Sequence, residues 1–515
     1  MARSLLSFDR GLPVVWSLQR IFAPVLVFIL FVLGVTLLAP SIASAQGSDD
    51  PVATADTNSP ADPPLQKPSD SPGFFRRFAK AYGDDWKGAD DPDLPRRGYP
   101  APVSSPPFPF SDWPYGGSPV IGAPDTSGGP LMSAIYSGEH GKAWQNSRVK
   151  TYGWINTGFN LSTSDKHYGN FPAAYYIQPN SIQLDQAALY IERVPDTVQS
   201  DHFDWGFRVT QIYGIDYRFT TAKGYFSQQL LGGNNKNGYD PVMAYVDLYW
   251  GQVADGMNVR IGRYISLPDI EAQLAPDNYT YSHSILYTFD AYTQTGINVT
   301  TKLNNHWMFQ VGLSAGNDVA PWVGEPDAKP TFNACVGYTW SLGGDNLYVC
   351  DNSTNSGKYA YNNLQAYYLT WYHKINSSWH TATETWYMWE KDVPNVNNPA
   401  AVPLLINGAN GAICSSPSDV TCYAPEWAIV NYVEKEFSPK NYLTIRNEYF
   451  NDIAGQRTGY KTQYSEHLIG WGHWFGTTVL IRPELRFEHA YDAPVYNLGT
   501  KHSQLVFASD IIYHF

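Results

Sequence analysis

The sequence has few charged residues and, beyond its first 40 residues, no long apolar run. Aspartate, glutamate, lysine and arginine make up 16% of the 515 residues, against about 25% in ordinary soluble domains. The formal net charge is −13, and an acidic protein does not bind nucleic acid by neutralising its phosphates. Because only apolar helices and closed barrels can span a membrane, a membrane protein of this composition would have to be a β-barrel.

Cysteine is scarce as well. The four cysteines form two local pairs, Cys335 with Cys350 and Cys414 with Cys422, in stretches rich in Gly, Asn, Ser and Asp. None of them shows the C-x2-C spacing of a zinc site. The pattern therefore predicts two disulfides in loops and an oxidising compartment, with neither a metal site nor a cofactor.

Catalytic motifs are also missing from the sequence. It contains no HExxH motif and no glycine-rich phosphate loop. The most suggestive histidines are His467 and His473, which lie close to Glu466, but no serine nearby has the context of a nucleophile. We therefore expect that the protein is not an enzyme.

The N-terminus has the pattern of a secretion signal. Arg3, Arg10 and Arg20 precede an apolar run over residues 21–38, and Ala43-Ser44-Ala45 supplies the small residues that a signal peptidase reads. Residues 1–45 are thus predicted to be a cleavable signal peptide. The apolar run reaches the length of a membrane-spanning helix, so an uncleaved anchor is the alternative.

Proline dominates the next segment, since residues 46–130 contain 17 of the 37 prolines. This composition predicts a disordered periplasmic segment over residues 46–110, with one helical face formed by Phe74, Phe75, Phe78 and Tyr82. The acidic residues that follow, Asp84 and Asp85 among them, indicate a solvated acidic run. Residues 111–148 are expected to lie at or in the periplasmic mouth of a barrel, as a small plug or as a linker.

Residues 149–515 repeat segments of about ten residues with a period of two, the length that a tilted membrane strand needs. In residues 479–488, apolar side chains alternate with arginine and glutamate. A soluble sandwich would bury the apolar face, whereas a membrane barrel would turn it toward lipid and the charges toward its lumen. The charged faces of such strands give ten candidates for lining the lumen and tuning permeation: Arg208, Asp247, Arg260, Lys302, Arg446, Glu448, Arg482, Glu484, Arg486 and Glu488.

Short and long connections alternate between these segments, as periplasmic turns and external loops do in outer-membrane barrels. The pattern predicts an all-β, single-chain, antiparallel transmembrane barrel of about 14 strands, within a range of 12 to 16. Both cysteine pairs fall in long connections and hence outside. The connection 265–284 would be either a constriction or a surface loop. The last strand ends at Phe515, and we expect barrel-assembly machinery to recognise it.

Several short motifs resemble a known family. They include Gly262-Arg263-Tyr264, Ala275-Pro276-Asp277-Asn278, Tyr281-Ser282-His283-Ser284 and Tyr292-Thr293-Gln294-Thr295-Gly296. Over about residues 110–515 the sequence is similar to the β-barrel porins described as OmpL-like. This resemblance implies a location in the outer membrane of a Gram-negative bacterium and passive diffusion, and it supplies no catalytic or ligand residues.

Three functions remain open at this level. The first is a channel for passive diffusion of small hydrophilic solutes, embedded in outer-membrane lipid. The second is a plugged structural or adhesive barrel that binds an external partner through its long loops, and the third is a soluble secreted carbohydrate-binding β-protein. The inward charges have both signs, which does not suit a strongly selective pore, and cross-strand ion pairing is the other reading of them. The oligomeric state is not specified by the sequence.

Overall fold

The structure is a computed structural model that describes residues 72–88, 121–122, 128–172, 175–265, 269–324, 329–340, 345–361, 363–376, 378–406, 409–438 and 440–515. The predicted signal peptide, most of the proline-rich segment and residues 111–120 lie outside these ranges. Among the described residues, no helix combines the length and the apolar character needed to cross a membrane.

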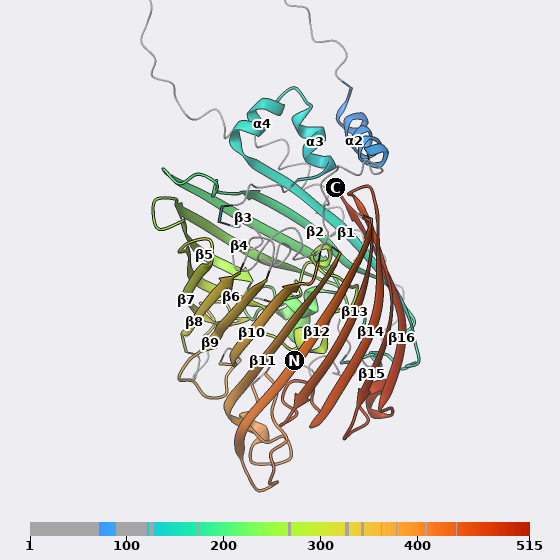
Figure 1. The fold of residues 1–515 in the computed structure, drawn as a ribbon. Helices are drawn as coiled ribbons and strands as arrows, with labels where there is room; N and C mark the ends of the chain where they lie inside the picture. The colour runs from blue at the N-terminus through green and yellow to red at the C-terminus, as the bar shows by residue number, and fades with distance from the viewer. Residues whose placement is uncertain are drawn as a thin grey trace, which may run out of the picture.

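Sixteen antiparallel strands form one closed barrel, in which each strand pairs with its neighbours in sequence and β1 pairs with β16 (Figure 1). This confirms the all-β barrel, with a strand number at the upper end of the expected range. The strands are β1 (Val149–Ser162), β2 (Ile182–Arg193), β3 (Phe203–Gly214), β4 (Gly238–Trp250), β5 (Met257–Ile265), β6 (Thr293–Lys302), β7 (Trp307–Asn317), β8 (Thr331–Thr339), β9 (Asn346–Thr354), β10 (Gln365–Lys374), β11 (Trp379–Pro394), β12 (Thr421–Ser438), β13 (Asn441–Asp452), β14 (Thr462–Phe475), β15 (Val479–Ala490) and β16 (Ser503–His514).

The two faces of the strands settle how the alternating pattern is used. On β15, Leu485 is 44% exposed on the outer surface, whereas the neighbouring Arg486 is fully buried inside. The outer surface carries apolar side chains on most strands, with Trp205, Trp307 and Phe475 near the short turns and Tyr367 and Tyr423 near the long loops. An apolar belt between two aromatic girdles is the surface of a lipid-embedded barrel, and it does not suit a soluble sandwich.

The hairpin of β8 and β9 lies where the sequence indicates only a long connection around Cys335 and Cys350. Its strands are only nine residues each and rich in small and polar side chains, so their alternation is weak. The pairing of Cys335 with Cys350 is confirmed, but its predicted position in an external loop is wrong. The two cysteines face each other in the ladder between β8 and β9 and are buried on the inner side.

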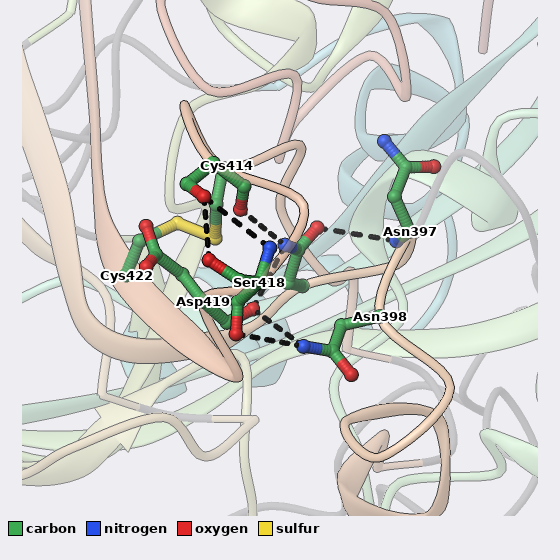
Figure 2. The surroundings of a disulfide bond; sticks show 8 residues. Asn397, Asn398, Cys414, Ser418, Asp419 and Cys422 are labelled. Atoms are coloured by element: carbon green, nitrogen blue, oxygen red, sulfur yellow. Dashed lines mark hydrogen bonds between the residues drawn. A yellow bond between two sulfur atoms is a disulfide. The ribbon is translucent and has the colours of Figure 1, made fainter.

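The second disulfide does belong to a long connection. Cys414 lies in the β11–β12 loop, and Cys422 is the second residue of β12 (Figure 2). Beside it, the Asn398 side-chain amide donates to the main-chain oxygens of Ser418 and Asp419, at 3.1 and 3.2 Å. The disulfide holds the end of the loop against the start of β12, and these hydrogen bonds hold the end of the loop against its beginning.

The two ends of the barrel differ, as the alternation of connections predicts. Short turns and the C-terminus lie at one end, beside helices α2 (Phe74–Gly88), α3 (Pro130–Tyr136) and α4 (Gly141–Ser147) (Figure 1). The helix expected from the aromatic spacing at Phe74–Tyr82 is therefore present. The long connections contain the remaining short helices: α5 (Tyr217–Thr220), α6 (Gln228–Leu231), η4 (Ala275–Asp277), α7 (Ile285–Thr288), η5 (Val402–Leu404) and α8 (Tyr496–Gly499).

The barrel closes between its first and last strands. Trp154 of β1 lies opposite His514, and Ser162 lies opposite Val506. Phe515 continues this ladder, because its main-chain N–H donates to the Gly153 oxygen at 2.9 Å. Its side chain packs against a small apolar cluster of α3 and α4 that includes Leu131 and Trp144.

We predict that Leu485→Arg impairs folding into membranes, because it places a charge on the lipid side near the middle of β15. Such a substitution costs about 2–4 kcal/mol at the bilayer midplane. The fraction of heat-modifiable, folded protein after refolding into vesicles is expected to fall, whereas Leu485→Met, which stays apolar, should behave like wild type. Equal folding of the two variants would contradict the outward orientation of Leu485.

Candidate functional site

The ten predicted lumen residues lie on the inner faces of six strands at the positions that the alternation indicates. Nine are buried and Lys302, at the short-turn end of β6, is half-buried. They come from β3 (Arg208), β4 (Asp247), β5 (Arg260), β6 (Lys302), β13 (Arg446, Glu448) and β15 (Arg482, Glu484, Arg486, Glu488). The charges on β3 to β5 have a different kind of partner from the charges on β13 and β15.

On the side of β2 to β5, the charges pair between neighbouring strands. Arg208 contacts Glu192 of β2 at 2.7 Å, and Arg260 contacts Asp247 at 2.7 Å. Arg263, which was not among the candidates, pairs with Asp240 in the same way. Opposite charges on adjacent strands stabilise the pairing by about 0.2–1 kcal/mol each, so these residues fit the reading as cross-strand ion pairs.

The opposite side of the lumen is occupied by the β5–β6 connection. Every residue in 269–292 is buried except the half-buried Asp277, so this segment, here called the inner loop, is folded into the barrel and is not a surface loop. Hydrogen bonds within the loop also fix its conformation. The Asn278 side chain bonds to both the N–H and the oxygen of Ala272 at 2.7 Å, and the Ser284 hydroxyl caps α7 by accepting from the Tyr287 N–H.

Three arginines of the barrel wall donate to main-chain oxygens of the inner loop. Arg446 donates to the Ser282 oxygen at 2.7 Å, and Arg486 donates to the His283 oxygen at 2.7 Å. Arg482 reaches two oxygens, those of Ala275 and Asn278, both at 2.8 Å. A guanidinium suits this task because its fork of N–H groups can serve several acceptors at once.

Each of these arginines also keeps an acidic partner. Arg446 pairs with Glu466 of β14 at 3.0 Å and with Glu271 of the inner loop at 3.2 Å. Arg482 pairs with Asp510 of β16, and Arg486 pairs with Glu488 at 2.8 Å. Because a buried charge without a partner is costly, these acids are what allow the arginines to lie in the interior.

Wall glutamates accept from the main-chain N–H groups of the same loop. Glu384 of β11 accepts from Ile270 at 2.9 Å, and Glu484 accepts from Ser282 at 3.1 Å. Glu448 accepts from Ile285 at 2.8 Å and also from Leu286. The alternation of arginine and glutamate on β13 and β15 thus matches the alternating donors and acceptors of a peptide chain, which explains why both signs occur together.

The inner loop is also fixed to the far side of the β1–β16 seam. Gln186 of β2 accepts from the Ala275 N–H at 3.1 Å and donates to the Gln273 oxygen at 2.7 Å. Between these attachments, the Tyr442 hydroxyl of β13 donates to the Tyr279 oxygen at 3.1 Å. The loop is therefore held by strands from β2 across the seam to β11, which is about half of the barrel wall.

Several of the residues that hold the loop were not found from the sequence. Gln186, Glu271, Glu384 and Asp510 are not among the ten candidates for lining the lumen. Glu271 was noted only as part of a connection whose path was open. The signal that could have found them is the excess of inward charge on β11 to β16, since buried charges need partners.

The histidines of β14 do not form a site with Glu466. His467 and His473 lie on the outer side of the strand, where their Nδ1 atoms contact Asn447 and Asn441 at 2.8 and 2.7 Å. Glu466 points to the inside and pairs with Arg446. The two kinds of side chain are thus separated by the barrel wall.

Asp290 lies at the end of the inner loop nearest the long connections. Arg457 of the β13–β14 loop donates to the neighbouring Phe289 oxygen at 3.1 Å. Burial raises the pKa of the Asp290 carboxyl to about 7, with Asp318 adding to the rise and contacts with Asp269 and Arg457 opposing it. The carboxyl therefore changes its charge near neutral pH.

Comparison with known proteins identifies a family. A family model described as "Putative beta-barrel porin-2, OmpL-like" matches residues 148–515. Comparison with curated proteins gives no match. Among solved structures, the anion-selective porin from Comamonas acidovorans is similar at 9% identity and a TM-score of 0.46, covering 71% of this chain and 99% of that one. The outer membrane channel DcaP of Acinetobacter baumannii is similar at 9% identity and a TM-score of 0.47, covering 71% and 97%. These likenesses concern the fold alone.

We predict that Arg446→Met loosens the inner loop, because it removes the ion pair of Glu271, leaves Glu466 with Arg486 alone at 3.7 Å, and removes a donor to the Ser282 oxygen. Breaking a buried ion pair costs about 3–5 kcal/mol, so the amides of the inner loop should lose at least about tenfold of their protection from hydrogen exchange. Arg208→Met is the matched control, since it removes a buried arginine whose ion pair lies away from the loop. Equal protection in the two variants would contradict the role of Arg446.

Proposed function

Since the chain belongs to the "Putative beta-barrel porin-2, OmpL-like" family, we propose that it is an outer-membrane channel for passive diffusion of small hydrophilic solutes. Its barrel is porin-like, with an apolar outer belt and a polar inner wall. Export through the signal peptide 1–45 and recognition of the last strand by barrel-assembly machinery are part of this proposal. Because Phe515 packs against α3 and α4 in the finished fold, that recognition would come before these helices dock.

The inner loop is the observation that carries the proposal. It covers the inner wall from β2 across the seam to β11, so the path for solutes would run along the opposite wall, from β3 to β10. The inner face of that wall carries uncharged polar side chains, such as Asn298, Thr300 and Gln310, which are 3–5% exposed, and its charges include the ion pairs of Arg208 and Arg260. Such a path would be hydrophilic and only weakly selective between cations and anions, because it lacks a ladder of one sign.

A plugged structural or adhesive barrel is the second candidate, and the depth of burial favours it. Arg446, Glu466 and Arg486 have no exposed side-chain surface, which shows that the inner loop fills its half of the lumen tightly. The long β11–β12 loop, fastened by Cys414–Cys422, projects beyond the barrel (Figure 1) and could contact an external partner. Conductance distinguishes the two candidates.

We predict that the protein forms unitary conductance steps in planar bilayers and that replacing residues 270–288 by a short Gly-Ser linker makes the steps larger, because the lumen widens. A variant in which residues 397–411 of the β11–β12 loop are shortened to the same linker should keep the wild-type conductance. If neither the wild type nor the variant without the inner loop conducts, the channel proposal fails and the plugged barrel remains.

The raised pKa of Asp290 predicts a dependence on pH. Below about pH 7 the carboxyl is neutral, so burying it in the inserted loop is not penalised; above that pH it ionises and favours a solvated position. We expect the inner loop to leave its place more often, and mean conductance to rise, as pH increases through about 7. Asp290→Asn, which cannot ionise, should flatten this rise. An identical pH profile in the variant would show that Asp290 is not responsible.

A further inference from the structure

Helix α2 is fastened to the rim of the barrel at the short-turn end. The Asp85 carboxylate accepts from the Thr477 N–H at 2.9 Å and from the Thr478 hydroxyl at 3.0 Å, in the turn between β14 and β15. The Trp86 indole N–H donates to the same Thr478 hydroxyl at 3.0 Å. The expectation that Asp85 belongs to a solvated acidic run is therefore wrong, because this carboxylate positions the helix.

The helix reaches the lipid side of the barrel wall. The Tyr82 ring stacks on Tyr513 with 5.1 Å between ring centroids, and its hydroxyl donates to the His514 oxygen. Tyr513 is on the same outer face of β16 as Phe507 and Ile511. α2 therefore lies at the short-turn end of the barrel wall, next to the C-terminus (Figure 1).

One face of the helix is aromatic and carries two exposed rings. Phe75, Ala79, Tyr82 and Trp86 follow a spacing of three or four residues, which places them on one face. Tyr82 is buried against the barrel, but Phe75 is 78% exposed and Trp86 is 52% exposed. The adjacent face, with Phe74 and Phe78, packs against the cluster of α3 and α4, so the exposed aromatics are not a missing part of that contact.

Basic residues flank the aromatic stripe. Arg76, Lys80 and Lys87 are exposed on the side of α2 away from the barrel, where Asp84 pairs with Lys80. The helix has four basic and two acidic side chains in a chain whose net charge is −13. A helix with aromatics on one face and lysine or arginine on the other is typical of the membrane interface, where it meets anionic headgroups.

We propose that α2 is a lipid-binding interfacial helix. Phe75 and Trp86 insert at the boundary between headgroups and acyl chains in the leaflet at the short-turn end, beside β15 and β16. Arg76, Lys80 and Lys87 contact anionic phospholipid headgroups. This site extends the lipid surface of the barrel outward from Tyr513 and ties the segment before the barrel to the membrane. It rests on the membrane location of the proposed function.

Depth measurement by spin labelling tests this inference. Both disulfides use all four cysteines, so single cysteines can be introduced into the full mature chain and labelled under non-reducing conditions. Ala79→Cys places a label on the aromatic stripe without removing Phe75 or Trp86, and Asp84→Cys is the matched control on the opposite face. Ile511→Cys reports on the barrel itself. The protein is reconstituted in vesicles of phosphatidylethanolamine and phosphatidylglycerol, and the accessibility of each label to oxygen and to a water-soluble nickel chelate is compared.

We expect the labels at positions 79 and 511 to show a several-fold higher ratio of oxygen to nickel accessibility than the label at 84. In the Ala79→Cys background, replacing Phe75 and Trp86 by serine should return the ratio to the value at 84. If position 511 is in lipid but position 79 is in water, the interfacial helix is refuted and the stripe is left for a protein partner. If position 511 is itself in water, the membrane barrel fails first, and with it the proposed function.

Discussion

Satisfying the polar main chain of the inner loop is the constraint on which the interior of this barrel depends. A peptide segment inside a closed barrel has no neighbouring strand to pair with, and an unpaired N–H or C=O in such a place is costly. The alternating arginines and glutamates of β13 and β15 provide the hydrogen bonds that a neighbouring strand would otherwise provide. Arginines serve the loop oxygens, glutamates serve its N–H groups, and their mutual ion pairs offset the cost of burying them.

The same constraint divides the barrel into two halves with different chemistry. The arginines of β3 and β5, Arg208 and Arg260, pair with an acid on a neighbouring strand. From β11 to β16 the inner charges form a network that is complete only when the inner loop is in place. A substitution of an inner charge on β2 to β5 should alter local strand pairing, whereas a substitution on β11 to β16 should affect the whole inner loop. Permeation, in the proposed function, depends on both: one half shapes the free wall and the other positions the constriction.

At the short-turn end, polar groups of the barrel rim are also paired by a segment that is not a strand. Asp85 satisfies the turn between β14 and β15, and Tyr82 covers Tyr513 at the end of the last strand. The segment before the barrel is thereby connected to the strand that closes it. In the folded protein, the ring of the terminal Phe515 is covered by α3 and α4.

The sequence by itself determined the alternating strands and which residues share a face, because a strand period of two is a local property that each segment carries independently. It also determined the last strand ending at Phe515, the helical face from Phe74 to Tyr82 and the pairing of the cysteines. That the apolar faces point outward from a closed barrel was decided by the tertiary structure. Only the tertiary structure decided the rest. The β8–β9 hairpin was not predicted because its small and polar residues alternate weakly. The Cys335–Cys350 disulfide joins these two strands and therefore lies on the inner wall. The path of the inner loop and the partners of Asp85 depend on residues more than a hundred positions away, such as Glu448 and Thr477, and contacts at that separation leave no periodic trace in the chain.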